Sequence, residues 1–262
     1  MKAPRGFLES HLRARRDAGA KLLVPYITGG IDPRWIDLVR SAADAGADAI
    51  EIGIPFSDPV MDGPTIQAAS EQAIARGATP GSILDDVSRA DVDIPLVVMT
   101  YFNIGFKMGV ERFAAEARSA GISGMILPDV PLEEMPEWDP AAQAAGLETV
   151  MLASPLTPED RLPLLTGRAQ GFVYGVNLLG VTGERATIGA MAAALGARIK
   201  AVTDVPAIMG FGISTPAQAA DVAAHADGVV VGSALMRRVL DGEGPLRLGQ
   251  AIAELRTALD AG

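Results

Sequence analysis

The stretch AIEIGIPF (residues 49–56) is an apolar run with one carboxylate in its middle. In a β-strand successive side chains point to opposite faces, so the three isoleucines share one face while Glu51 shares the other with Ala49 and Gly53. If the isoleucine face packs on covering helices, Glu51 points into the interior of a sheet or barrel. An unpaired carboxylate there is costly or has a raised pKa. A chemical role is therefore favoured over the alternative of a salt-bridged or edge-strand glutamate.

Similar apolar runs recur along the chain, separated by alanine-rich helical patterns. Strands that are apolar nearly throughout, each followed by a helix, pair in parallel with both faces covered. Eight such units in about 250 residues predict an α/β fold of the closed (β/α)8 TIM-barrel type, with an extra N-terminal helix before the first strand. The runs are LLVPYITG (22–29), DAIEIG (48–53), PLVVMTY (95–101), GMILPD (124–129), ETVMLAS (148–154), GFVYGVN (171–177), PAIMGFG (206–212) and GVVVGSAL (228–235).

Helical patterns lie between these runs and after the last one. The expected helices span residues 35–45, 110–120, 158–165, 187–195, 216–224 and 244–259. A doubly wound open sheet is the alternative fold. Such a sheet typically has a G-x-G-x-x-G turn after an early strand, and the end of the first run, ITGGIDP (27–33), lacks that spacing. Because no Ser-rich linker or charge block divides the chain, residues 1–262 are expected to form a single domain.

Composition excludes several classes of function. The chain has no cysteine and only two histidines, which excludes disulfides and Cys-based metal sites and leaves little for a His-rich one. A net charge of −10 argues against nucleic-acid binding. No apolar run is long enough to span a membrane, and the N-terminal segment is charged where a signal peptide needs an apolar core. We therefore expect a cytoplasmic protein without a metal site.

The ends of the last two strands carry phosphate-binding chemistry. Active sites of such barrels lie at the C-terminal ends of the strands, where this chain has GFGIS (210–214) and GSA (232–234), with Thr182-Gly183 in an earlier loop. Glycines let backbone N–H groups approach an anion, and a helix N-terminus adds positive charge. Each motif alone is also ordinary turn chemistry, but their joint occurrence favours a phosphate site. Neither contains Lys or Arg, which points to a small phosphomonoester instead of ATP.

A second carboxylate follows Glu51 by eleven residues: Asp62, beside Gly63 in a turn-rich loop. Two carboxylates in different environments suit general acid/base chemistry, although Asp before Gly is also a common turn pair. Tyr101 and Tyr174 end barrel strands, either as site residues or as core aromatics. The apolar wall expected beside them consists of Tyr26, Met99, Leu127 and Phe211. Such a wall suggests a substrate with a flat aromatic portion.

Together these motifs resemble one family, the α subunit of tryptophan synthase, from about Val24 to Leu235. The stretches that carry the resemblance are VPYITGG, EIGIPFSDPVMDGPTIQ, LPDVPLEE, YGVNLLGVTG, GFGIS and VVVGSALM. The second is specific to that family, whereas GFGIS and GSA recur in other phosphate-binding barrels. The resemblance implies a lyase of tryptophan biosynthesis that cleaves indole-3-glycerol phosphate to indole and glyceraldehyde 3-phosphate. It also implies no cofactor of its own, and an α2β2 tetramer with a pyridoxal-phosphate-dependent β subunit.

The resemblance also implies residue roles. Glu51 matches the family's barrel-interior acid/base, and Asp62 matches the carboxylate that holds the indole N–H. Tyr174 matches the family's active-site tyrosine. Thr182 and Gly183, within residues 179–186, match the loop that closes over the site in the family. Gly212, Gly232 and Ser233 match the family's phosphate cradle. Retro-aldol cleavage requires protonation of indole C3, removal of a glycerol hydroxyl proton and relief of positive charge at the ring nitrogen. Glu51 suits the first two steps and Asp62 the third.

Two alternatives to a coupled α subunit stay open at this point. One is a free-standing lyase that releases indole, and the other is a catalytically weak regulatory partner of a β subunit. Two short segments depart from the family pattern near its docking and closing loops: Asn103-Ile104-Gly105 stands where Asn-Pro is expected, and Asn177-Leu178-Leu179 where Ser-Arg is common. The docking loops themselves are expected at residues 57–59, 103–106 and 131–134.

Overall fold

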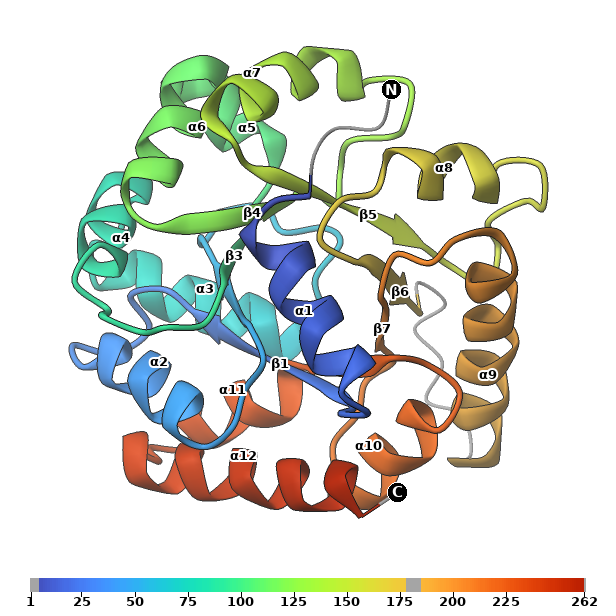
Figure 1. Cartoon of the computed structure of the whole chain (residues 1–262). Helices are drawn as coiled ribbons and strands as arrows, with labels where there is room; N and C mark the ends of the chain where they lie inside the picture. Colours follow the sequence, from blue (N-terminus) through green and yellow to red (C-terminus); the bar gives the residue numbers. More distant parts are fainter. Residues whose placement is uncertain (1–4, 178–184, 262) are drawn as a thin grey trace.

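The computed structural model describes residues 5–177 and 185–261. Within that part of the chain, eight parallel strands close into a barrel in sequence order, with β1 hydrogen-bonded to both β2 and β8 (Figure 1). The barrel predicted from the apolar runs is confirmed. The strands are β1 (Leu22–Thr28), β2 (Ile50–Gly53), β3 (Leu96–Met99), β4 (Ile122–Ile126), β5 (Glu148–Ala153), β6 (Val173–Val176), β7 (Ala207–Gly210) and β8 (Gly228–Val231).

Helices surround the barrel on its outside (Figure 1). They are α1 (Phe7–Asp17), α2 (Trp35–Asp44), α3 (Pro64–Ala75), α4 (Pro80–Val87), α5 (Phe102–Met108), α6 (Val110–Ser119), α7 (Asp139–Ala145), α8 (Leu162–Arg168), α9 (Arg185–Val202), α10 (Pro216–Ala223), α11 (Ser233–Leu240) and α12 (Pro245–Asp260), with a 3-10 turn η1 (Met135–Glu137). The helices expected at 35–45, 110–120, 216–224 and 244–259 are confirmed to within a residue or so at each end. The helix expected at 158–165 begins later, at Leu162, and α9 is longer than expected.

The sequence patterns missed some short helices and misplaced one boundary. Helices α3, α4, α5 and α7 were not predicted from their own segments. The run GVVVGSAL (228–235) is strand only to Val231, because Gly232 caps the helix that Ser233 begins. In α5, the unexpected Gly105 has a packing reason, since a Cβ there would lie 2.9 Å from the ring of Phe113 on α6.

Two apolar layers position the strands, one inside the barrel and one between barrel and helices. The alternation predicted for β2 is confirmed, because Ile50, Ile52 and Ile54 belong to the outer layer while Ala49 belongs to the inner one. The inner layer consists of Leu8, Leu12, Leu22, Val24, Ala49, Val97, Ile126, Val150, Phe172, Ile208 and Val230. Glu51 therefore faces the barrel interior, as its place in the run indicated.

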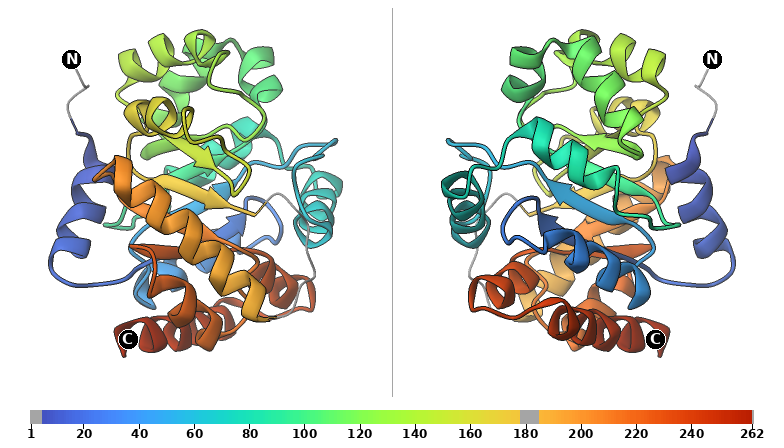
Figure 2. Two further views of the ribbon diagram at one scale, coloured as in Figure 1. Left: turned by 90° about the vertical axis from the view of Figure 1, so that its right-hand side faces the viewer. Right: turned by 90° about the vertical axis from the view of Figure 1, so that its left-hand side faces the viewer.

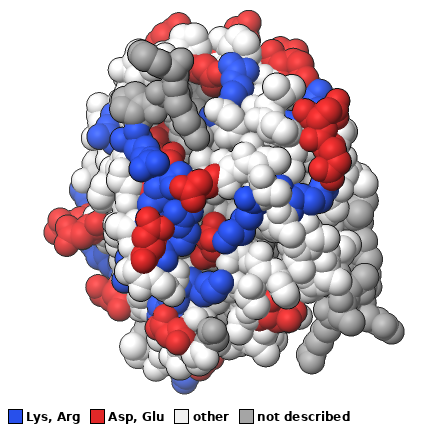
Figure 3. All heavy atoms as spheres, turned by 45° about the vertical axis from the view of Figure 1, so that its right-hand side comes forward, with Lys and Arg blue, Asp and Glu red and all other residues white. Residues whose placement is uncertain are grey.

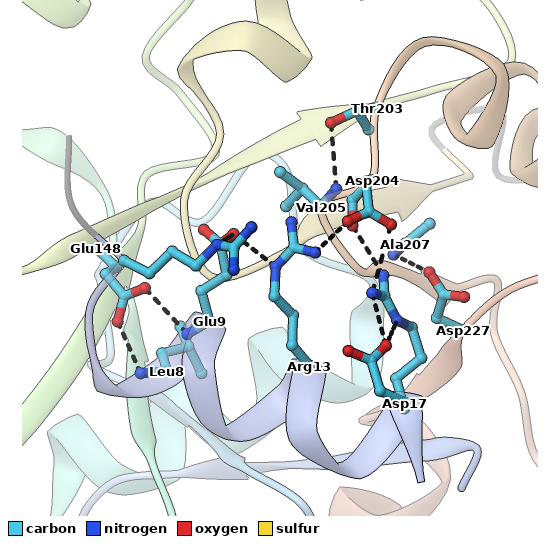
Figure 4. Close-up of polar contacts among 12 residues, drawn as sticks. Leu8, Glu9, Arg13, Asp17, Glu148, Thr203, Asp204, Val205, Ala207 and Asp227 are labelled. Atoms are coloured by element: carbon cyan, nitrogen blue, oxygen red, sulfur yellow. Dashed lines mark hydrogen bonds and ion pairs between the residues drawn. The ribbon is translucent and has the colours of Figure 1, made fainter. Parts of the chain in front are cut away.

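Helix α1 closes the N-terminal end of the barrel. It contributes Leu8 and Leu12 to the inner layer, and the Glu148 carboxylate accepts hydrogen bonds from the backbone N–H groups of Leu8 and Glu9 at 2.7 and 3.0 Å (Figure 4). A carboxylate at a helix N-terminus satisfies N–H groups that have no partner inside the helix. Arg13 on the same helix pairs with Glu9. With α1 across this end (Figure 2), access to the barrel interior is from the opposite end.

Charged side chains of both signs are interspersed on the face shown in Figure 3. No broad basic surface extends across that face, in keeping with the acidic composition. In the part of the chain that the structure describes, none of the helices is both long enough and apolar enough to cross a membrane.

Candidate active site

A cavity of about 250 Å³ lies at the C-terminal end of the barrel. Its lining comes from all strands or the segments directly following them, which is the location of active sites in this fold. The lining residues are Tyr26, Glu51, Met61, Asp62, Gly63, Ile66, Met99, Pro128, Leu152, Tyr174, Val176, Asn177, Gly210, Gly212, Ile213, Val230, Gly232 and Ser233. Both carboxylates singled out in the sequence thus face one space.

Glu51 lies at the bottom of this cavity and is only 1% exposed. The pKa of its carboxyl is raised to about 8, chiefly by burial and also by the nearby charge of Asp62, against a hydrogen bond from Tyr174 that lowers it. Its Oε2 atom is buried and has no hydrogen-bond partner among the described residues. A buried oxygen without a partner is costly, so this atom is available to a ligand in the cavity.

Asp62 reaches the same cavity from the loop between β2 and α3. The loop is held on both sides of the carboxylate: the Asp62 backbone carbonyl accepts from Gln67 Nε2 at 2.8 Å, and the Met61 N–H donates to the hydroxyl of Tyr101 at 2.9 Å. Burial raises the pKa of Asp62 to about 6, against a hydrogen bond from Tyr101 that lowers it. Two carboxyls with different pKa values therefore face one space, as acid/base chemistry requires.

Tyr26 and Tyr174 fit beside Glu51 because glycines on neighbouring strands leave room for their rings. A Cβ on Gly53 would lie 1.9 Å from the Tyr26 hydroxyl oxygen, and one on Gly210 would lie 2.5 Å from Cε2 of Tyr174. Burial raises the pKa of Tyr174 well above its usual value, so it stays a neutral phenol and a hydrogen-bond donor toward Glu51. The sequence signal for this arrangement, a glycine at the end of β2 and of β7, was not used to predict it.

The opposite side of the cavity is formed by backbone of the last two strand ends. Gly212 has a φ of +69°, a conformation that favours glycine, and Gly232 and Ser233 stand at the N-terminus of α11. A Cβ on Gly232 would approach Tyr26 Cβ to 3.3 Å. Among the described residues, the cavity lining includes no Lys or Arg, and no group of three His, Asp or Glu residues is placed to hold a metal.

Most residues predicted for the site meet at this cavity, but not all. Tyr101 lies behind Asp62, stacked on Phe56 with ring centroids 5.0 Å apart. Leu127 and Phe211 are not among the residues that line this cavity; both are 2% exposed and pack in the outer layer between barrel and helices, so their place in the apolar wall stays a prediction. Leu127 follows the inward-facing end of β4, so alternation directs it outward. Thr182 and Gly183, with most of the loop at 179–186, lie outside the described residues.

Several lining residues were missed by the sequence reading. Apolar ones are Met61, Ile66, Pro128, Leu152, Val176, Ile213 and Val230, and one is polar, Asn177. Leu152, Val176 and Val230 lie at positions of their strands whose side chains face the barrel interior. The alternation rule that predicts the orientation of Glu51 therefore also predicts theirs. Met61 and Ile66 come from a loop and a helix start, for which strand alternation gives no signal.

Comparison with known proteins identifies relatives over nearly the whole chain. The family model described as "Tryptophan synthase alpha chain" matches residues 12–257. The tryptophan synthase alpha chain of Streptomyces coelicolor is 43% identical over 238 residues, which cover 89% of this chain and 88% of the relative. That of Geobacter sulfurreducens is 44% identical over 244 residues, with 91% and 92% covered.

Solved structures agree with these sequence relatives. Tryptophan synthase subunit alpha from Legionella pneumophila str. Paris superposes with a TM-score of 0.90 at 33% identity, covering 99% of this chain and 100% of that chain. A chain of Mycobacterium tuberculosis tryptophan synthase also gives 0.90, at 35% identity and with the same coverage. The similarity therefore includes every strand of the barrel and the loops that form the cavity.

Proposed function

We propose roles for individual residues on one premise: the chain belongs to the tryptophan synthase alpha chain family. It is a lyase that cleaves indole-3-glycerol phosphate to indole and glyceraldehyde 3-phosphate. The observation that carries our assignment of the acid/base is the Oε2 atom of Glu51, buried in the cavity without a partner among the described residues and facing the same space as Asp62.

Glu51 acts first as an acid and then as a base. A pKa of about 8 keeps its carboxyl protonated at neutral pH, so it can deliver a proton to C3 of the indole ring. The ring then carries positive charge at its nitrogen, which Asp62 offsets, because a carboxyl with a pKa of about 6 is mostly ionised at pH 7. The carboxylate left on Glu51 removes the proton from the hydroxyl next to the ring while the carbon–carbon bond breaks. The proton count is unchanged, and indole and an aldehyde are formed.

Tyr174 and the glycine-rich strand ends complete the proposed site. The phenol of Tyr174 donates to Glu51 and so orients its carboxyl. The phosphate of the substrate is assigned to the backbone amides near Gly212, Gly232 and Ser233, where the N-terminus of α11 adds partial positive charge. Tyr26 and Met99 provide apolar surface for the ring. Thr182 and Gly183 keep the closing role that the resemblance implied.

The test of the role assigned to Asp62 is indole release by the purified chain and its Asp62→Asn variant. The amide cannot balance positive charge at the ring nitrogen, so we expect turnover to fall by at least about 10²-fold. A matched control is Asp58→Asn in the same loop, where the carboxylate is exposed and accepts a hydrogen bond from its neighbour Ser57. Normal turnover by Asp62→Asn would return that residue to an ordinary turn role.

We further propose that this chain docks on a pyridoxal-phosphate-dependent β subunit in an α2β2 complex. Support comes from exposed apolar side chains around the cavity end of the barrel: Phe106 is 64% exposed and Val60 is 82% exposed. A surface hollow of about 420 Å³ lies beside the first of them. It is lined by Phe102, Asn103, Phe106, Asp129, Val130, Pro131, Glu134 and Glu137. Two of the three docking loops expected from the sequence, 103–106 and 131–134, thus share one hollow.

The partner is tested by adding a cognate β subunit to the purified chain and measuring indole formation. We expect stimulation of at least severalfold, equivalent to a coupling of roughly 1 to 3 kcal/mol. Phe106→Ser should reduce this stimulation and leave the basal rate unchanged, whereas Leu246→Ser, also an exposed apolar residue but on α12, should change neither. Fast release that no β subunit alters would establish the free-standing lyase. We also propose that the chain is a single domain and that it is located in the cytoplasm. Fluorescence imaging of a tagged chain would check the location.

A further inference from the structure

A second hollow of about 390 Å³ adjoins the active-site cavity. It lies at the ends of β4 and β5 against α8, and buried apolar side chains such as Leu127, Met135 and Met151 form much of its lining. Protein interiors are close-packed, so an apolar space of this size beside an active site needs a reason. The proposed mechanism does not use it.

Four residues line both spaces and therefore form the wall between them. Pro128, Leu152 and Val176 stand in or directly after consecutive strands β4, β5 and β6, so their positions are fixed by the barrel. The fourth, Met61, lies on the loop between β2 and α3, and its side chain is 43% exposed. Methionine is unbranched and adapts its shape easily. Met61 is thus the most adaptable part of this wall.

The backbone of Met61 is fixed even though its side chain is adaptable. Its N–H donates to the Tyr101 hydroxyl at 2.9 Å, and the next residue is Asp62. If Asp62 holds the ring nitrogen, which is the proposed function on which this inference rests, the indole ring lies directly beside the Met61 side chain. Truncation of that side chain would then join the ring site to the second hollow without moving Asp62.

We propose that Met61 determines how large an aromatic ring this enzyme accepts, and that the hollow behind it is a side pocket for a ring extended beyond indole. The pocket is apolar where such a ring would enter, between Leu152 and Val176, and polar groups such as Thr157 and Arg161 lie elsewhere on its lining. Its occupant is therefore a fused or alkyl-substituted aromatic ring of the substrate itself.

The test compares Met61→Ala with the unaltered chain in binding and in cleavage. Calorimetry measures the affinity for indole and for isomeric benzo-fused indoles, and kinetics compares kcat/KM for the corresponding glycerol phosphates. One methylene in an apolar pocket typically changes selectivity by about 10- to 200-fold. We expect Met61→Ala to raise the preference for at least one benzo-fused isomer over indole by at least roughly tenfold.

A filling variant and a surface variant serve as controls. Leu132 lines the second hollow but not the active-site cavity, so Leu132→Trp should reverse the gain when combined with Met61→Ala. Leu164→Ala, 62% exposed on α8, should change no preference. An unchanged binding preference in folded Met61→Ala overturns the inference, even if that variant cleaves nothing. The ring-nitrogen role of Asp62 is judged separately, by whether Asp62→Asn loses turnover of the ordinary substrate.

Discussion

Replacement of Glu51 by glutamine separates the chemical cost of this carboxyl from its cost to folding. Burial raises the Glu51 pKa from its usual 4.5 to about 8, so the native protein binds this proton more tightly than the unfolded chain does. The stabilisation from that proton is fully present below about pH 4.5 and is lost as the pH rises toward 8. A pKa rise of this size corresponds to about 5 kcal/mol as an upper limit, at 1.36 kcal/mol per pH unit.

Glutamine keeps the shape of the side chain and does not ionise. Glu51→Gln should therefore resemble the unaltered chain in its free energy of unfolding at pH 5 and exceed it at pH 8, by up to about 5 kcal/mol. The same substitution should lower indole release by at least about 10²-fold, because the amide neither donates nor accepts the proton that the reaction moves. Greater stability with less activity is the combination expected of a carboxyl retained for catalysis.

Urea unfolding at the two pH values, together with an assay of indole release, measures both effects. The matched control is Glu71→Gln on α3, where the side chain is exposed, and its stability difference from the unaltered chain should be the same at both pH values. Two results would refute the reasoning: a Glu51→Gln stability difference that does not change with pH, or retention of more than about a tenth of the turnover.

Four further predictions follow from the same contacts. The pH profile of kcat/KM should be bell-shaped, falling below about 6 as Asp62 is protonated and above about 8 as Glu51 ionises, and a flat profile between pH 5 and 9 would contradict it. Tyr101→Phe removes the hydrogen bond that lowers the Asp62 pKa, so the acid limb should move to higher pH in the same assay. Gly210→Ala places a Cβ 2.5 Å from the Tyr174 ring and should lower kcat by at least about tenfold, whereas Gly81→Ala, with open space around it, should not. Gly232→Val should raise KM and weaken competition by glycerol phosphate, because the added side chain blocks the close approach of an anion to the backbone; an unchanged inhibition constant for glycerol phosphate would contradict the cradle.

The barrel could be predicted from the sequence because buried parallel strands have a simple pattern. Eight runs that are apolar nearly throughout predict the strand count, and the alternation of side chains along the second run predicts the face on which Glu51 lies; the interior layer confirms that face for Ala49. The same rule places Leu127 and Phe211 on the outward face of their strand ends, because Ile126 and Ile208 belong to the inner layer. Alternation is thus the stronger guide to which side chains line a barrel.

The helices and loop contacts were harder to predict for physical reasons. Helix α5 is short and glycine-containing, and it depends on the packing of Gly105 against Phe113, a contact between two different helices. The hydrogen bond from the Met61 N–H to the Tyr101 hydroxyl, which supports the loop beside Asp62, joins residues 40 positions apart. The wall formed by Met61 exists only where four segments meet. Such contacts depend on tertiary structure, and no local pattern encodes them.

A crystal structure of the Glu51→Gln variant with intact indole-3-glycerol phosphate tests the central assignment most directly. We predict the ring N–H within hydrogen-bond distance of Asp62, the hydroxyl next to the ring beside the amide of residue 51, and the phosphate at the backbone of Gly212, Gly232 and Ser233. A substrate bound with its phosphate toward residue 51, or with its ring nitrogen away from Asp62, would contradict the account.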